Sequence, residues 1–433
     1  MRYKIRKEHA GGIAFDRVER RLIPVSLDQI SRLEGLLKGP CGLVAIAGLP
    51  HLFTPSGAVN YSIIDASLAP DGGWGENCLA APNRLYLELT RDCNLRCRMC
   101  YNQAARRLPG ELSLAQIQRL LDEMDRIAVF EARLTGGEPT RRPDFFAILD
   151  YAIARDFYVS LATNGVWDSG LTAAVCQRRI DDVIVSLDGP EAINDWVRAG
   201  GSFRTSISTI RALKEAGIAK VRINTVISRW NWREVELLFQ ICSDYDLLLI
   251  DFIHPRPFGR GAAPEAQQMM LTPDQMLEFN LLVRRLRDKY PGVKVVMDFD
   301  LLSTSDIPRH PIVPRVFACP AGREFAFVSP QGYVFPCGVA PVHDVSLMSE
   351  AEKRLFLAGN VLERSILEIW HDSPVWVPFR DLNKCKPPKC RMCGYWGKKC
   401  FGTCPLGAYY ANGHLEGEDP YCYSDLVSLA GLA

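Results

Sequence analysis

The sequence predicts an α/β protein built on a partial (β/α)6 barrel, with a small domain before the barrel and a cysteine-rich domain after it. Short β-rich runs alternate with helical patterns between residues 85 and 252, and alternation of this kind specifies a parallel sheet. Residues 70–83 are rich in Gly, Pro and Asn, which indicates a linker. Past about residue 300 the periodic segments give way to Pro, Gly and Cys. The expected domains are residues 1–80, 81–300 and 301–433.

Six segments have the composition of strands, and four of the segments between them have the periodicity of helices. Strands are expected at Leu85–Leu89, Ala132–Leu134, Tyr158–Ala162, Val183–Leu187, Val221–Val226 and Leu248–Phe252. Helices are expected at 114–128, 143–155, 204–216 and 232–244. Ser113 with Gln116, and Asn231 with Glu234, have the spacing of a capping box. Helices are therefore expected to begin directly after Ser113 and after Asn231.

Composition excludes several classes of protein. The chain has 433 residues, of which 48% are hydrophobic, so it can bury a large core. Its formal net charge is +1, which gives no sign of a nucleic-acid partner. No apolar stretch approaches the roughly 20 residues that cross a bilayer, and no signal peptide follows Met1. We expect a cytoplasmic protein with no membrane partner.

Fifteen cysteines are the unusual feature of the composition. They cluster, and their odd number in a chain without a secretion signal argues against a disulfide framework and for metal ligation. Four of them stand alone among apolar or loop residues and are expected to be small buried hydrophobes rather than ligands. These four are Cys41, Cys78, Cys176 and Cys242.

Cys93, Cys97 and Cys100 share one short loop after the first expected strand of the barrel. Three thiolates on one loop can hold three corners of a cubane iron-sulfur cluster, and the fourth iron is then left for an outside ligand. A structural zinc site is the alternative, but it needs four protein ligands. The loop contains no His and no fourth Cys.

This C-x3-C-x2-C loop resembles that of the radical S-adenosylmethionine (SAM) superfamily, in which SAM binds the open iron. Residues 135–139 (TGGEP), 162–165 (ATNG) and 186–189 (SLDG) resemble further motifs of that family. Each falls at the carboxyl end of an expected strand, where barrels have their active-site rim. The resemblance implies reductive cleavage of SAM to a 5′-deoxyadenosyl radical, with the electron supplied by a reductant such as flavodoxin or ferredoxin. The SAM contacts implied by the resemblance are Met99, Tyr101, Gly136, Gly137, Glu138, Asn164, Ser186 and Arg198.

The cysteines near the carboxyl terminus are similar in order and spacing to the SPASM extension of radical SAM enzymes, which carries two auxiliary iron-sulfur clusters. The resemblance thus implies SAM and three 4Fe-4S clusters in all. A zinc ribbon over residues 390–404 is the alternative, because thiolates also suit zinc. The implied ligands are Cys319, Cys337 and Cys404 for the first auxiliary cluster, and Cys390, Cys393, Cys400 and Cys422 for the second.

The first auxiliary set is one ligand short. A water or a substrate group could complete the fourth iron, or His310 or Cys385 could do so. We expect the open site, because Cys385 lies close to the second set and a lone His near several prolines is usually a surface residue. An open iron could bind a substrate thiolate and lower its pKa.

Residues 2–37 show three short strands followed by a helix that starts at Ser26. This pattern resembles the PqqD-like recognition element, a small winged-helix-like domain that binds the leader of a precursor peptide at its sheet edge. The resemblance implies that the leader binds to residues 1–80. A cap that only stabilises the barrel is the alternative.

The three domains together resemble maturases that cross-link ribosomally made peptides through thioether or carbon-carbon bonds, which makes the chain an oxidoreductase and peptide cyclase by this resemblance. The alternatives are a sulfatase maturase, a decarboxylase of tetrapyrrole side chains, and a non-catalytic iron-sulfur electron carrier. Sulfatase maturases usually have an acidic residue directly after the cysteine that corresponds to Cys337. This chain has Gly338 there, which argues against a sulfatase maturase. An electron carrier would need neither the GGEP nor the SLDG motif. No catalytic acid or base is identified.

Overall fold

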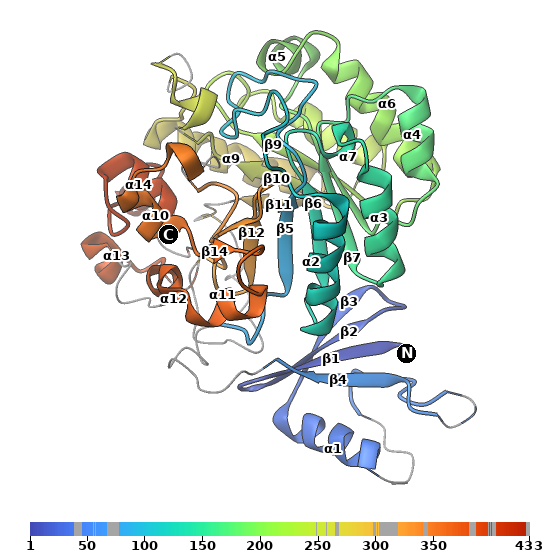
Figure 1. Ribbon diagram of the computed structural model, residues 1–433. Helices are drawn as coiled ribbons and strands as arrows, with labels where there is room; N and C mark the ends of the chain where they lie inside the picture. Colours follow the sequence, from blue (N-terminus) through green and yellow to red (C-terminus); the bar gives the residue numbers. More distant parts are fainter. Residues whose placement is uncertain are drawn as a thin grey trace.

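The computed structural model has an N-terminal sheet, a ten-stranded sheet that contains the barrel strands, and a C-terminal set of short helices (Figure 1). No helix in the described ranges is both long and apolar enough to span a bilayer. The structure describes residues 1–38, 46–54, 56, 58–66, 78–247, 249–256, 258–264, 268–297, 300, 302, 319–340, 345–380, 387–396, 398, 400 and 404–429.

The six expected barrel strands are confirmed. They pair in chain order, and every pair is parallel. Alternate residues such as Leu134, Val183 and Ile250 are fully buried in the main core, because successive side chains of a strand point to opposite faces. The strands are β5 (Arg84–Glu88), β6 (Glu131–Thr135), β7 (Tyr158–Thr163), β8 (Asp182–Ser186), β9 (Lys220–Val226) and β10 (Leu249–Ile253).

Helices between the strands cover the outer face of this sheet (Figure 1). The capping box of Ser113 and Gln116 is confirmed at the start of α2. The buried residues of α2 are spaced by three and four, and they form one apolar stripe against the sheet. These helices are α2 (Leu114–Arg126), α3 (Phe145–Ala154), α4 (Ser169–Cys176), α6 (Ser202–Glu215), α7 (Glu236–Asp244) and α9 (Pro273–Lys289). A short η1 (Pro139–Arg141) follows β6, and α5 (Glu191–Val197) lies at the carboxyl ends of the strands, where Val197 packs with Met99.

The expected capping box at Asn231 was wrong. Helix α7 begins at Glu236, and its first turn has no side-chain cap. The Asn231 side chain instead donates hydrogen bonds to the backbone oxygens of Asp188, at 2.9 Å, and Val226, at 2.8 Å. Asn231 thus joins the loop after β8 to the end of β9, and these contacts outweigh its local capping preference.

Strands from the C-terminal region extend the barrel sheet, which the sequence did not indicate. β12 (Phe325–Val328) pairs in parallel with β5, and the antiparallel β13 (Tyr333–Phe335) and β14 (Gly359–Asn360) follow it. β11 (Lys294–Met297) adds to the other edge, beside β10. The short helices are η2 (Gly259–Ala262), η3 (Val345–Leu347), α10 (Glu350–Phe356), α11 (Ile366–Asp372), η4 (Pro374–Trp376), α12 (Val377–Arg380), α13 (Pro388–Met392), α14 (Pro405–Asn412) and α15 (Ser424–Leu429).

The N-terminal domain has the three expected strands and the expected helix, together with a fourth strand. β1 (Tyr3–Glu8), β2 (Gly11–Asp16) and β3 (Arg21–Val25) are antiparallel, and α1 spans Leu27–Lys38. The additional β4 (Tyr61–Asp65) pairs in parallel with β1, so the strand order is β3-β2-β1-β4. β3 is therefore one edge of this sheet.

One face of the N-terminal sheet packs against α1, and the other packs against the amino ends of the barrel strands. The fully buried Arg6 donates to the backbone oxygen of Ala128 at 2.8 Å, and the rings of Phe15 and Phe130 lie 5.9 Å apart. Residues 78–83, within the expected linker, are mostly buried, and the Leu79 N–H bonds to the Arg323 oxygen at 3.0 Å. The N-terminal domain is thus packed onto the barrel.

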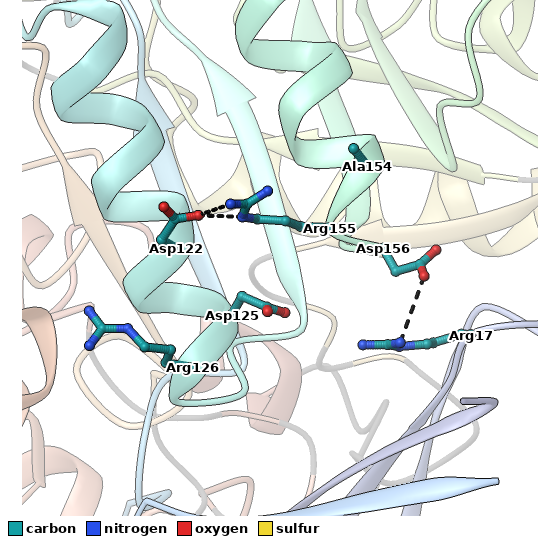
Figure 2. A pocket seen from close by; sticks show the side chains of 7 residues that line it. All are labelled: Arg17, Asp122, Asp125, Arg126, Ala154, Arg155 and Asp156. Carbon is teal, nitrogen blue, oxygen red and sulfur yellow. Dashed lines mark hydrogen bonds and ion pairs between the residues drawn. The ribbon is translucent and has the colours of Figure 1, made fainter.

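A charged pocket of about 450 Å³ lies at this junction (Figure 2). The turn after β2 contributes Arg17, which pairs with Asp156 at 3.8 Å. Arg155 pairs with Asp122 across helices α2 and α3 (Figure 2). All of these residues lie at the amino-end side of the barrel, away from the expected SAM-binding motifs.

Candidate active site

The expected SAM-binding motifs meet at the carboxyl ends of the barrel strands. Residues 90–101, which we call the cysteine loop, follow β5 and lie at the end of the barrel opposite to the N-terminal sheet (Figure 1). The GGEP motif follows β6, Asn164 follows β7, and Ser186 ends β8 opposite Asn224 of β9. The parallel sheet thus brings the motifs to one rim.

The three cysteines of the loop lie in a largely dry environment. Cys93 is buried, whereas Cys97 and Cys100 are half-buried. Burial raises the pKa of the Cys93 thiol to about 11 and also raises that of Cys97. Metal ligation requires thiolates, and a set of three thiols on one loop fits an iron-sulfur cluster with one open iron.

Gly136 and Gly137 let the loop after β6 pack directly against the cysteine loop. A Cβ atom on Gly136 would lie 2.7 Å from the Thr90 oxygen, and one on Gly137 would lie 2.5 Å from the Asp92 oxygen. The Gly137 N–H bonds to the Thr90 oxygen at 2.8 Å. The two glycines therefore have a packing role in addition to their predicted contact with SAM.

Glu138 is fully buried, and its carboxylate joins two rim loops. It accepts hydrogen bonds from the Thr163 hydroxyl at 2.9 Å and from the Asn164 N–H at 2.8 Å. The Thr140 hydroxyl donates to it at 2.7 Å. Burial raises the pKa of Glu138, although these bonds oppose the rise. This geometry gives Glu138 a positioning role, and its predicted contact with SAM stays a prediction.

The remaining predicted SAM contacts lie in the cysteine loop or beside it. The Asn164 amide donates to the side-chain oxygen of Asn94 at 2.8 Å. Arg198 Nε lies 2.7 Å from Asp188 Oδ2, and both side chains are buried. Met99 packs with Val197 and Met269 in a small apolar cluster.

Tyr101 is held by residues of the segment that follows β10. Its ring packs edge-on against Phe258, with the ring centres 6.1 Å apart. Gly259 has φ +62°, and a Cβ atom there would lie 2.1 Å from the Tyr101 oxygen. The Arg260 side chain donates to the backbone oxygens of Cys97, at 2.8 Å, and Ala104, at 3.1 Å. The Gly259-Arg260 pair was visible in the sequence, but its contact with the cysteine loop depends on the fold.

Below the rim, inward-facing side chains form a charged layer across the barrel. Arg222 bridges Asp182, at 2.7 Å, and Asp251, at 3.0 Å. Burial alone would raise the pKa of Glu131, but the charges of Arg133 and Arg84 lower it to about 2. The positive charges of three arginines therefore offset the negative charges of three carboxylates. The charged layer consists of Arg84, Glu131, Arg133, Asp182, Arg222 and Asp251.

The three cysteines predicted for the first auxiliary cluster lie near one another. Burial raises the pKa of Cys337 well above its ordinary value, and the charges of Cys319 and Cys404 raise it further. Cys404 is the N-cap residue of α14, and its sulfur accepts from the Gly407 N–H at 3.4 Å. His310 and Cys385, the candidate fourth ligands, lie outside the described residues.

The cysteines predicted for the second auxiliary cluster lie on neighbouring C-terminal segments. Cys390 is within α13 and Cys393 directly follows it. Lys389 of α13 pairs with Asp425 of α15 at 2.8 Å, and Cys422 lies just before α15. Their joint ligation of one cluster, together with that of Cys400, stays a prediction.

Comparison with known proteins identifies the family of the chain. The Radical SAM superfamily model matches residues 87–241, and the SPASM iron-sulfur cluster-binding domain model matches residues 319–394. Mycofactocin maturase MftC of Mycobacterium tuberculosis (strain ATCC 25618 / H37Rv) is 33% identical over 354 residues, which cover 80% of this chain and 84% of that protein. The chain belongs to the radical SAM/SPASM family. Both domains of this radical SAM/SPASM enzyme thus imply 4Fe-4S clusters, and the barrel implies SAM binding.

A further relative and a solved structure are also similar to this chain. An AdoMet-dependent heme synthase of Methanosarcina barkeri is 29% identical over 367 residues, covering 79% of this chain and 96% of that protein. The crystal structure of Streptococcus suis SuiB bound to precursor peptide SuiA matches with a TM-score of 0.67 at 16% identity, covering 96% of this chain and 97% of that one. That coverage takes in most of the N-terminal domain as well as the barrel and the SPASM domain.

Proposed function

We propose that this radical SAM/SPASM enzyme is a peptide cyclase that cross-links a ribosomally made precursor peptide through a thioether or carbon-carbon bond. The observation that carries the proposal is the 33% identity to a mycofactocin maturase over 80% of the chain. The SuiB structure, which shares the fold of nearly the whole chain, was solved with a precursor peptide. Three 4Fe-4S clusters with the predicted cysteine ligands, the predicted SAM contacts and a cytoplasmic location are parts of the proposal.

When bound, the cluster and SAM supply a 5′-deoxyadenosyl radical that removes hydrogen from an unactivated carbon. The chain must hold the target carbon beside the radical and keep water away. Glu138 and the Gly136-Gly137 pair fix the loops around the cysteine loop. The charged layer occupies the barrel interior below the rim, so the peptide segment to be modified enters from the rim.

The N-terminal sheet supports leader recognition by strand addition. β3 is an edge strand, and an edge strand offers unpaired backbone groups to an added strand. Leu22 of β3 is 45% exposed and offers an apolar contact there. The PqqD-like assignment of this domain remains part of the proposal.

We expect Leu22→Asp to weaken binding of a leader peptide about tenfold, because it removes an apolar contact and adds a charge at the strand-addition edge. Fluorescence anisotropy of a labelled leader measures the affinity, and dithionite-driven SAM cleavage should not change. Leu37→Asp, on α1 and 48% exposed, is the matched control. Equal weakening in both variants, or none in Leu22→Asp, would rule out the β3 edge. A point change is preferable to deletion of residues 1–80, because that domain is packed onto the barrel.

Decarboxylation of a tetrapyrrole side chain is the second candidate. The observation that favours it is the 29% identity to an AdoMet-dependent heme synthase, because the matched residues cover 96% of that protein. The two candidates differ in substrate and in product, since decarboxylation releases carbon dioxide and leaves no cross-link.

A further inference from the structure

Four arginines lie exposed on the outer surface of the cysteine loop and its continuation. Residues 93–110 include these four arginines and no acidic residue, although the whole chain has a formal net charge of only +1. Together with the nearby Trp196, they form what we call the arginine face. Its residues are Arg96, Arg98, Arg106, Arg107 and Trp196, all of them exposed.

Hydrogen bonds tie Arg96 to the segment that carries Arg106, and Arg98 to Trp196. The Arg96 guanidinium donates to the backbone oxygen of Ala105 at 2.7 Å, beside Arg106. Arg98 donates to the backbone oxygen of Trp196 at 2.9 Å, and its guanidinium lies 4.6 Å from the centre of that ring. Trp196 is 45% exposed, and its ring packs edge-on against Trp230 at 4.7 Å.

Acidic side chains beside this segment are already engaged. Asp92, whose backbone bridges to Ala105, pairs with Arg141 at 3.4 Å. Glu111, whose side chain is 0% exposed, pairs with Arg107 at 3.1 Å. Asp195 accepts from the N–H groups of Gly201, at 2.6 Å, and Phe203, at 2.8 Å. The remaining arginine charges therefore face solvent and give this surface a positive potential.

We propose that the arginine face is the docking site for an acidic one-electron carrier protein that reduces the cluster held by the cysteine loop. The inference rests on the proposed reductive use of SAM and adds the surface through which the electron enters. Arg98 lies between two predicted ligands, Cys97 and Cys100, so a protein on this face approaches the cluster closely. An exposed Trp among arginines is typical of an interface centre, and opposite charges accelerate association.

The electron count of the step is balanced. The carrier loses one electron, and SAM accepts it as the bond between its sulfur and its C5′ carbon breaks. The products are methionine, the 5′-deoxyadenosyl radical and the carrier oxidised by one electron. No proton is transferred in this step.

Arg106→Glu tests the proposal with reduced flavodoxin as the probe. Arg106 makes no hydrogen bond or ion pair with the rest of the described chain, so its replacement should leave the fold intact. We expect kcat/KM for the flavodoxin to fall about tenfold at low salt and the difference from wild type to shrink as salt increases. SAM cleavage is measured as 5′-deoxyadenosine without any peptide, and cleavage driven by dithionite should stay unchanged.

Arg285→Glu on α9 is the matched control, because Arg285 is also exposed and the change in net charge is the same. An equal loss in both variants, or no loss in Arg106→Glu, would overturn the proposal. So would an equal loss of dithionite-driven cleavage. Because no peptide enters the flavodoxin assay, failure of the proposed peptide chemistry would leave its result unaffected.

Discussion

Replacing Cys93, Cys97 and Cys100 together by Ala should abolish release of 5′-deoxyadenosine from SAM. The three thiols lie on one loop at the barrel rim, and without them no open iron remains to bind SAM. The auxiliary clusters should persist, because their predicted ligands lie after residue 318. Iron analysis after anaerobic reconstitution should give about twelve irons for the wild type and about eight for the triple variant.

Cys176→Ala provides the control for this experiment. Cys176 is half-buried at the end of α4 and belongs to none of the predicted ligand sets, so the variant should keep both its iron and its activity. Release of 5′-deoxyadenosine by the triple variant with dithionite would contradict the assignment of the SAM cluster. About four irons together with bound zinc in the wild type would contradict the auxiliary clusters.

Gly259→Ala should reduce SAM cleavage on the order of 100-fold. The new Cβ would lie 2.1 Å from the Tyr101 oxygen and 2.8 Å from the Cys100 oxygen, so the cysteine loop must move. A displacement of about 1 Å at reacting groups can cost this much in rate. Dithionite-driven release of 5′-deoxyadenosine measures the effect, and loss of iron to a chelator should also be faster.

Gly217→Ala is the control that distinguishes the steric effect of the new Cβ on the cysteine loop from the effect of backbone strain alone. Gly217 has φ +77°, and no atom lies within 4 Å of the position of its Cβ. In both variants the left-handed backbone conformation of the new alanine destabilises the protein by about 1–2 kcal/mol. Only in Gly259→Ala does the new Cβ also clash with the cysteine loop. If the two variants lost activity equally, Gly259 would have no positioning role.

Local patterns predicted the elements that depend on local physics. The alternation of strands and helices gave all six barrel strands, because period-two and period-3.6 patterns are set within each segment. Ser113 and Gln116 cap α2 as expected. The expected SAM-binding motifs could be placed at one rim, because the carboxyl ends of parallel strands lie at the same end of the sheet.

Tertiary contacts decided what the sequence did not reveal. β12 pairs with β5 across more than 200 residues, and no local pattern indicates that pairing. Asn231 bonds to the loop after β8 and to the end of β9 instead of capping α7. Arg260 reaches the cysteine loop only because the chain after β10 folds over it. Each of these features requires a neighbour that is distant in sequence.

The central claim is tested most directly by the mass of the peptide product. The reconstituted enzyme would be incubated anaerobically with SAM, dithionite and a leader-bearing precursor peptide. We predict a peptide that has lost two hydrogen atoms and carries an internal cross-link, formed together with 5′-deoxyadenosine. An unchanged peptide despite SAM cleavage, with carbon dioxide released when a tetrapyrrole carboxylate is supplied instead, would contradict the proposed function and favour the second candidate.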